Sequence, residues 1–193
     1  MVKREIRFDD NTMTGQISLR IRSATPDDVA AIAFIYGHHA LHGTGTFEEE
    51  APSIEDMADR LAKVHARGWP WLVAEKDGQV VGYAYAAQFR DRAAYRFAAE
   101  DSVYIHPDHM GAGIGKALLE ALLPASAASG FQRMFAVIGD SANTGSIRLH
   151  ERAGFDPCGK LDKAGFKFGR YLDVVFMQRE IPPLPLRERV PAA

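Results

Sequence analysis

The chain has 193 residues, of which 47% are hydrophobic and 25% are charged, and this matches one globular domain. Its 23 Lys and Arg against 25 Asp and Glu give a formal net charge of -2, so no overall basic field favours non-specific nucleic-acid binding. A single cysteine excludes an internal disulfide framework, no apolar run is long enough to span a bilayer, and the first ten residues lack the apolar centre of a signal peptide. We therefore expect a cytoplasmic protein without a nucleic-acid or membrane partner, whose function lies in local motifs.

The N-terminal part of the chain predicts an extension, a strand and two helices. Residues 1–17 are polar and weakly patterned, which indicates a flexible extension before a domain at 18–180. Alternating apolar and charged residues at 19–22 favour a half-buried strand. Thr25 and Ser53 are each followed by acidic residues, as is typical of a helix N-cap. The apolar positions of the two helices repeat at helical spacing and should face the core: Val29, Ile32, Ala33 and Tyr36, then Ile54, Met57, Leu61 and Val64.

The middle of the chain predicts a hairpin and a further strand. Residues 70–75 and 80–89 are apolar runs separated by a short polar turn that contains Asp77-Gly78. Asp-Gly between apolar runs is a strong hairpin signal. Another short strand is expected at 102–106.

The C-terminal part predicts two helices, three strands and a tail. A helix is expected over 113–128, which Pro124 should kink or divide. The remaining elements are a strand at 134–138, a short helix at 143–153, strands near 155 and over 172–178, and a proline-rich tail at 181–193. The order β-α-α-β-β-β-α-β-α-β-β predicts an α/β (α+β) protein with a mixed sheet covered by helices.

A glycine-rich turn joins the strand at 102–106 to the following helix. Gly111, Gly113 and Gly115 let backbone amides converge without side-chain obstruction. Because a helix N-terminus adds the positive end of a dipole, the turn predicts an anion site suited to phosphate. The same glycines could serve only as a tight turn, and the loop by itself leaves both interpretations open.

The loop departs from two well-known nucleotide-binding motifs. A P-loop needs Gly-Lys followed by Ser or Thr, but Ala117 follows Gly115-Lys116, and Met110 stands where the first glycine belongs. The dinucleotide fingerprint fails because Lys116 takes the place of its third glycine and no acid stands about 20 residues downstream. These mismatches argue against a nucleotide-binding protein.

Neither the histidines nor the cysteine indicate a reactive centre. His38 and His42 lie four residues apart, but no HExxH pattern and no suitably spaced acid accompanies them, so we expect no metal. Cys158 has no CxxC partner and is expected to be a small buried or surface residue. The acidic stretch at 48–59 is most simply a solvated helix entrance.

Two motifs in sequence order resemble those of the GCN5-related N-acetyltransferase (GNAT) superfamily. The first is its acetyl-CoA loop, Arg/Gln-x-x-Gly-x-Gly/Ala, which here reads Met110-Gly-Ala-Gly113-Ile-Gly115 with Met in place of the leading Arg or Gln. The second runs from Asn143 to the sequence His150-Glu-Arg-Ala-Gly-Phe155. The departure at Met110 removes a side-chain contact or cap and leaves the backbone amides in place. The resemblance implies the GNAT fold, and the predicted order of elements agrees with it.

Further segments resemble the phosphinothricin N-acetyltransferase-like branch, which includes enzymes that act on methionine sulfoximine and sulfone. They are Thr44-Gly-Thr-Phe-Glu48, the stretch from Arg90 to Ile105, and Gly165-Phe-Lys-Phe-Gly-Arg-Tyr-Leu-Asp173. The resemblance spans about residues 18–180. It implies acetyl-CoA as co-substrate and a homodimer, for which sequence periodicity gives no independent support.

The resemblance also implies which residues hold acetyl-CoA. Backbone amides around Tyr104 and Ile105 would hold the thioester, and the glycine loop would hold pyrophosphate. Asn143 would cap its helix or reach the cofactor, and these two roles are compatible. The implied set is Val103, Tyr104, Ile105, Met110, Gly111, Ala112, Gly113, Ile114, Gly115, Lys116, Asn143 and Ser146.

Two residues are candidate catalytic groups. Glu100 stands where the family places its proposed base, and burial would have to raise its pKa for efficient proton transfer. It could otherwise be a solvated acid at a strand end, and Asp101 should face the opposite side of a regular strand. His150 stands where many family members carry a Tyr as general acid, and an imidazole can donate a proton near neutral pH. His150 could instead support the base or pack within its helix.

Four residues are candidate contacts for the acceptor substrate. Arg binds planar or tetrahedral oxyanions through paired hydrogen bonds, and in the resembling branch basic and aromatic residues contact the acidic end of the substrate. Arg90, Arg92 and Tyr95 are the matching positions, although they could form only a solvated basic loop. Phe47 could line the substrate pocket or belong to the core.

These observations together predict an N-acetyltransferase that moves acetyl from acetyl-CoA to the amino group of a small amino-acid-like substrate by direct attack. Such a transfer needs a neutral amine, a stabilised carbonyl oxygen and a leaving thiolate, and no metal. Two alternatives stay open: a different acceptor such as another amine or a protein N-terminus, and a non-catalytic acyl-CoA-binding module.

Overall fold

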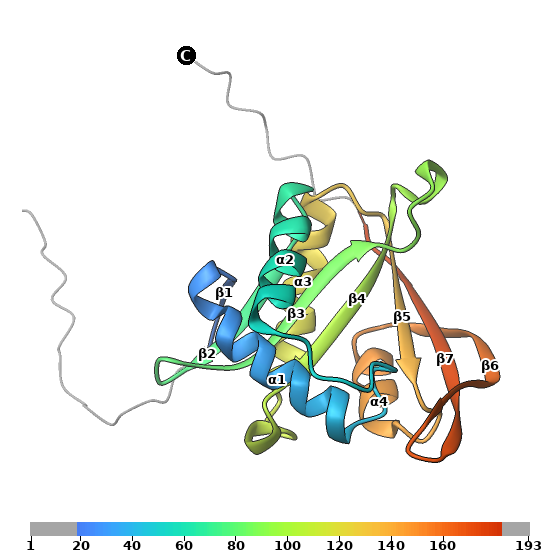
Figure 1. The fold of residues 1–193 in the computed structure, drawn as a ribbon. Coiled ribbons are helices and arrows are strands. Elements are labelled where there is room, and N and C mark those ends of the chain that lie inside the picture. Colours follow the sequence, from blue (N-terminus) through green and yellow to red (C-terminus); the bar gives the residue numbers. More distant parts are fainter. Residues whose placement is uncertain (1–18, 183–193) are drawn as a thin grey trace, which may run out of the picture.

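The computed structural model describes residues 19–182, which form one mixed sheet with helices on both of its faces (Figure 1). The predicted extension at 1–17 and residues 183–193 of the predicted tail lie outside the described residues. The strands are β1 (Arg20–Ser23), β2 (Trp71–Lys76), β3 (Gln79–Gln88), β4 (Ala98–Ile105), β5 (Arg133–Gly139), β6 (Asp156–Lys167) and β7 (Arg170–Glu180). The helices are α1 (Val29–His42), α2 (Ile54–Ala66), α3 (Ile114–Ala128) and α4 (Thr144–Arg152), with short 3-10 turns at Pro26–Asp28, Ala93–Tyr95 and Pro107–His109.

The sheet has seven strands in the order β1-β2-β3-β4-β5-β7-β6. Its neighbours are antiparallel except for β4 and β5, which run parallel. The predicted order of elements and the mixed sheet are therefore confirmed. Within residues 19–182, no helix combines the length and the apolar character that crossing a bilayer requires.

Two hydrophobic cores lie on opposite faces of the sheet. Figure 1 shows α1 and α2 on one face and α3 on the other. In β2, Trp71 and Val73 pack toward α1 and α2, while Leu72 and Ala74 pack toward α3. The two-residue period of the strand thus divides its side chains between the cores, and this is why residues 71–74 of β2 are all apolar rather than alternating.

Three local predictions differ from the structure. Pro124 lies inside α3, which continues without interruption to Ala128. Leu118 and Leu122, both completely buried, anchor this helix against the sheet, and such burial offsets the backbone hydrogen bond that a proline removes. Ile54 is the first residue of α2 and is 59% exposed, so it is not part of the predicted apolar face. Ile181 was predicted to begin the tail, but it is 3% exposed and extends the core beyond β7.

The parallel pairing of β4 and β5 ends halfway along both strands. The paired residues run from Ala98 opposite Arg133 to Asp101 opposite Ala136. Beyond this point β4 continues to Ile105 and β5 to Gly139 without a β4–β5 bridge, and Figure 1 shows the two strands diverging. The divergence leaves backbone groups of β4 without a strand partner, in the middle of the sheet.

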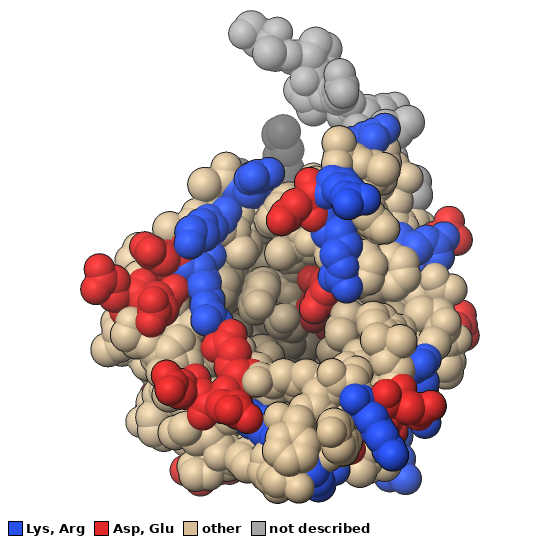
Figure 2. Space-filling model, turned by 45° about the vertical axis from the view of Figure 1, so that its right-hand side comes forward, with Lys and Arg blue, Asp and Glu red and all other residues tan. Residues whose placement is uncertain are grey.

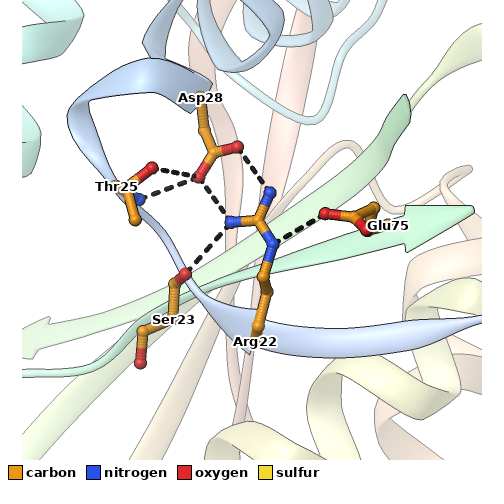
Figure 3. Close-up of polar contacts among 5 residues, drawn as sticks. All are labelled: Arg22, Ser23, Thr25, Asp28 and Glu75. Carbon is orange, nitrogen blue, oxygen red and sulfur yellow. Dashed lines mark hydrogen bonds and ion pairs between the residues drawn. The ribbon is translucent and has the colours of Figure 1, made fainter. Parts of the chain in front are cut away.

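The N-terminal edge of the domain is fixed by a charged cluster around Arg22 (Figure 3). The Arg22 guanidinium donates two hydrogen bonds to the Asp28 carboxylate, at 2.7 and 2.8 Å, and one to Glu75 at 2.8 Å. Asp28 also accepts from the backbone and hydroxyl of Thr25. These contacts hold the pKa of Asp28 below its ordinary value, and they tie β1, β2 and the start of α1 together.

Candidate active site

The glycine-rich turn forms an open cradle at the start of α3. Gly111 and Gly113 have φ angles of 77° and 80°, a left-handed conformation that strains any residue with a Cβ. No atom lies within 4 Å of the place where either Cβ would be, so the cradle is open to a ligand. Gly113 is the N-cap and provides no side-chain cap, which leaves the first amides of α3 free to donate. The turn therefore has the backbone and dipole of an anion site.

The other predicted residues of this loop differ in exposure. Met110 is 59% exposed, whereas Ile114 is buried in the α3 core. Gly115 allows a close helix contact, because a Cβ there would lie 3.2 Å from the Leu149 side chain of α4. Lys116 forms an exposed ion pair with Glu120 at 2.7 Å. The loop thus presents backbone amides more than side chains to a ligand.

Strand β4 presents free backbone amides to the gap between β4 and β5. The His106 amide donates to Val81 of β3, and by alternation Tyr104 also turns its backbone toward β3. The amides of Val103 and Ile105 therefore point toward the gap, where pairing with β5 has ended. The Tyr104 ring packs against the α1–α2 core, 4.9 Å from the ring of Tyr36. Of the amides predicted to contact the thioester, that of Tyr104 therefore faces β3, and those of Val103 and Ile105 face the gap.

Glu100 lies on β4 at the rim of this region and pairs with Arg90. The Arg90 Nη1 atom is 3.5 Å from Glu100 Oε2, and the two side chains are 53% and 34% exposed. Burial raises the pKa of Glu100 above its ordinary value; the positive charge of Arg90 opposes the rise, and the nearby charge of Asp101 adds to it. A carboxylate with a raised pKa and partial exposure suits a group that accepts a proton.

The predicted acceptor contacts gather partly around Glu100. The Arg90 guanidinium lies over the Phe89 ring at 4.0 Å, and Tyr95 packs edge-on against the same ring at 5.9 Å. Arg92 is exposed at the start of the turn that contains Tyr95. Figure 2 shows a hollow whose floor is formed by uncharged residues, with Lys and Arg side chains and acidic side chains along its rim. Arg90, Tyr95 and Glu100 are thus brought together, whereas within residues 19–182 the Arg92 side chain forms no hydrogen bond or ion pair with them.

His150 lies on the opposite side of β4 from Glu100, against Asp101. Its Nε2 atom is 2.9 Å from Asp101 Oδ2, and its Nδ1 atom is 2.8 Å from the carbonyl of Ser146. The His150 side chain is 4% exposed and the Asp101 side chain 1%. Burial lowers the pKa of His150, but the hydrogen bond and charge of Asp101 outweigh it and raise the pKa above its ordinary value. The expectation that Asp101 faces away from Glu100 is confirmed.

The protonation state of His150 follows from its partners. A carbonyl only accepts hydrogen bonds, so Nδ1 must carry a hydrogen. The Nε2–Asp101 contact then requires a second proton shared by the pair. Both ring nitrogens are therefore engaged, and the structure does not bring His150 together with Glu100.

Helix α4 begins beside the same gap. Asn143 is its N-cap, and the side-chain Oδ1 accepts from the Ser146 amide at 3.2 Å. Its amide nitrogen lies 3.6 Å from where a Cβ on Gly45 would be. The Ser146 hydroxyl is 3.5 Å from His150 Nδ1. Of the two compatible roles predicted for Asn143, the structure contains the cap.

Phe47 lies on a loop that covers the end of β5. A Cβ on Gly165 would overlap the Phe47 ring, and one on Gly139 would lie 3.0 Å from it, so the ring rests on two bare backbone segments. The ring is 38% exposed, which places it at the surface and outside both buried cores. This position suits a residue that lines a substrate pocket.

The remaining candidates carry no reactive cluster. His38 and His42 have ring centroids 5.0 Å apart, and His39 Nε2 donates to the carbonyl of Ile105 at 2.8 Å. Within residues 19–182 no three His, Cys, Asp or Glu side chains gather as metal ligands. Cys158 is exposed on β6. In the acidic stretch, Glu48 forms a two-bond ion pair with Arg60, at 3.0 and 3.1 Å.

Comparison with known proteins identifies the chain. Residues 44–155 match the model of the Acetyltransferase (GNAT) family, which is more than half of the chain. The protein belongs to the GNAT family. It is 48% identical to a phosphinothricin N-acetyltransferase of Alcaligenes faecalis over 83% of this chain and 82% of that one. It is 40% identical to an L-methionine sulfoximine/L-methionine sulfone acetyltransferase of Salmonella typhimurium, over 84% of this chain and 95% of that protein.

Solved structures agree with this family assignment. A GNAT superfamily phosphinothricin acetyltransferase from Sinorhizobium meliloti, in complex with acetyl-CoA, has a TM-score of 0.82 and 45% identity, with 84% of this chain and 88% of that chain covered. The predicted GNAT fold and the predicted branch are thus confirmed.

The GNAT site of this chain fits acetyl-CoA. The open cradle at Gly111 and Gly113 and the free amides at the start of α3 suit a pyrophosphate. The amides of Val103 and Ile105 at the strand gap suit the carbonyl groups of an extended ligand. Asp101 and Lys167 are two buried polar residues for which the sequence predicted no role in the site. Lys167 had one visible signal, a charge between Phe166 and Phe168 at the end of a strand.

Proposed function

We propose that this GNAT protein is an acetyl-CoA-dependent N-acetyltransferase that acetylates the amino group of phosphinothricin- or methionine sulfoximine-type amino acids. The observation that carries the proposal is the partly buried Glu100, with its raised pKa, on the strand that also presents free amides to the gap beside β5. The relatives named for these substrates support the choice of acceptor.

On the acceptor side, Arg90 and Tyr95 bind the acidic end of the substrate. Arg90 is half exposed beside Glu100, so its guanidinium can bind an oxyanion while its attractive field favours an anionic substrate. Arg92 and Phe47 are also assigned to this side, as rim contacts. Glu100 accepts a proton from the substrate ammonium at its carboxylate, directly or through water, which leaves a neutral amine for attack.

On the donor side, acetyl-CoA supplies an activated acetyl group in its thioester. Backbone amides of Val103 and Ile105 hold its carbonyl groups, and the loop at 110–116 holds pyrophosphate. Asn143 and Ser146 line the same region from α4. We assign His150 a supporting role through Asp101, because both of its nitrogens are already hydrogen-bonded.

A panel of acceptors tests the proposal. Thiol release from acetyl-CoA is measured with phosphinothricin, methionine sulfoximine, methionine sulfone, a polyamine and a peptide with a free N-terminus. We expect kcat/KM for the first three to exceed that for the polyamine and peptide by about a hundredfold, since Arg90 selects for an acidic group beside the amine. Preference for the polyamine or peptide contradicts the substrate assignment, and acetyl-CoA binding without turnover of any acceptor contradicts enzymatic function.

We also propose that the protein forms a homodimer through the hairpin of β6 and β7. Phe166, Phe168 and Tyr171 are 58%, 55% and 63% exposed, and Leu161 on the same hairpin is 53% exposed. β6 is an edge strand of the sheet, and most of its residues are exposed. An exposed apolar patch on a long edge strand is typical of an interface.

Light scattering after size exclusion tests the dimer. We expect wild type at twice 21.2 kDa. The double variant Phe166→Glu/Tyr171→Glu should elute as a monomer with unchanged circular dichroism. Dimerisation would bury two glutamate carboxylates in the interface, and the free energy of removing them from water opposes association. A wild-type protein that is monomeric at micromolar concentration overturns the dimer.

A further inference from the structure

Lys167 is a buried lysine at the end of β6. It is 2% exposed and is the one buried residue of a strand that is otherwise exposed except at the half-buried Gly165. Its Nζ atom donates to the carbonyls of Gly43 and Thr46, both at 2.9 Å. Among residues 19–182 no carboxylate lies within ion-pair distance of it, and the Phe168 ring centroid lies 5.0 Å away. The ammonium is thus satisfied by backbone and an aromatic face, which is rare for a buried charge.

The two carbonyls belong to the loop that carries Phe47. Gly43 follows α1, so Lys167 joins the hairpin of β6 and β7 to a loop more than 120 residues away in the sequence. The other side of the loop is held by Tyr36 of α1, whose hydroxyl is 2.9 Å from that of Thr46. The loop is therefore fixed between a helix and the last hairpin of the sheet.

The loop is also fitted against bare backbone. On Gly165, which lies two residues before Lys167 in β6, a Cβ would meet ring atoms of Phe47 at 2.6 and 2.9 Å and overlap a third. Gly139 at the end of β5 makes a similarly close approach to the Thr44 carbonyl. Neither glycine has a positive φ, so the need for glycine comes from the close approach and not from backbone conformation.

The chemistry of these contacts explains why a lysine stands there. Two carbonyls that converge on one point need a donor with several N–H groups and no acceptor, which an ammonium provides. A methionine would fill a similar volume but leave both carbonyls without a donor. The loop would then lose the tie that presses Phe47 onto Gly165.

We propose that Lys167 is a positioning residue that sets the acceptor pocket, by holding the 43–47 loop so that Phe47 lies at its rim. This inference rests on the proposed function for its kinetic part. The Lys167 ammonium binds the 43–47 loop and not the cofactor cradle at 110–116, so acceptor binding and acetyl-CoA binding are expected to respond differently to its replacement.

Two variants and two measurements test the proposal. For Lys167→Met we expect the KM of the best acceptor to rise about tenfold, while the dissociation constant of acetyl-CoA changes less than twofold. Lys167→Arg keeps donors for both carbonyls, so its acceptor KM should lie close to the wild-type value. The exposed Lys63→Met on α2 is the matched control and should resemble wild type.

A measurement independent of activity follows the loop itself. Endoproteinase Glu-C cleaves after glutamate, and Glu48, Glu49 and Glu50 directly follow Phe47. We expect cleavage at 48–50, identified by mass, to be about fivefold faster in Lys167→Met than in Lys63→Met. If wild type acetylates no acceptor, the proposed function fails, and this measurement still decides whether Lys167 holds the loop.

Gly165→Ala perturbs the contact between Phe47 and β6 directly and leaves the Lys167 ammonium in place. Its Cβ would displace Phe47, so the same rise in acceptor KM and in cleavage at 48–50 is expected. If Lys167→Met does not fold, this variant still tests whether the position of Phe47 sets acceptor binding. Unchanged acceptor KM and cleavage in either folded variant overturns the proposal, as does an equal loss of acceptor and acetyl-CoA binding.

Discussion

Replacing Glu100 with glutamine is expected to lower kcat by about 10²–10⁴-fold, the usual contribution of a general base. Glutamine keeps the size of the side chain but cannot accept the ammonium proton of the substrate. Because the amides at the strand gap and the glycine cradle are untouched, acetyl-CoA affinity should stay within about twofold of wild type. Steady-state kinetics and a binding titration measure the two quantities.

The pH dependence gives this prediction a second readout. Burial raises the pKa of Glu100, so in wild type the rate should fall as pH decreases through that raised pKa, where the carboxylate becomes protonated. The acidic limb should disappear in Glu100→Gln. Glu55→Gln, an exposed carboxylate on α2, serves as the control and should keep both the rate and the limb. Full turnover of Glu100→Gln at every pH contradicts the assignment of the base.

Asp101→Asn is expected to destabilise the protein by about 3 kcal/mol, which corresponds to a fall in Tm of roughly 6–12 °C. The substitution leaves the His150 imidazole buried without a negative partner. Asp101 is also the last β4 residue paired with β5, so the Asp101–His150 contact holds α4 where the two strands separate. Urea denaturation measures the loss, with the exposed Asp59→Asn as control.

The Asp101–His150 pair also predicts a pH dependence of stability. Asp101 raises the pKa of His150 above its ordinary value of 6.5. The stability from this group is therefore fully present below about pH 6.5 and is lost as pH rises through the higher folded pKa. In the double variant Asp101→Asn/His150→Gln, which removes both charges, part of the stability should return and the pH dependence should be absent. If Asp101→Asn lowers the free energy of unfolding no more than Asp59→Asn does, the Asp101–His150 pair does not stabilise the fold.

Much of the fold was predictable because its signals are local. The cap residues, the Asp-Gly turn and the period of apolar residues predicted the four helices and most strands within a few residues, but the strand expected near 155 extends to Lys167. Pro124 was a further exception. Its local cost predicts a kink or a division of α3, and only the burial of the leucines that precede it explains why the helix continues.

The local features of the candidate site were predictable from the sequence, but its long-range contacts were not. Glycines at 111 and 113 indicate an anion cradle because their freedom at positive φ is a property of each residue. Glu100 and Asp101 were expected on opposite faces because a strand alternates. The alternation of β4 does not show which residues pack against each of its faces. The sequence therefore left three roles open for His150: general acid, support for the base, or packing.

The sequence by itself therefore determined the order of elements, the phosphate-type loop and the family resemblance. Only the tertiary structure decided that both nitrogens of His150 are hydrogen-bonded, one of them within a buried pair, and that Lys167 contacts the loop of Phe47. The physical reason is distance along the chain. Asp101 and His150 are 49 residues apart, and Lys167 and Gly43 are 124 apart, so no local pattern records these contacts. Packing of the sheet between its two layers of helices brings them together.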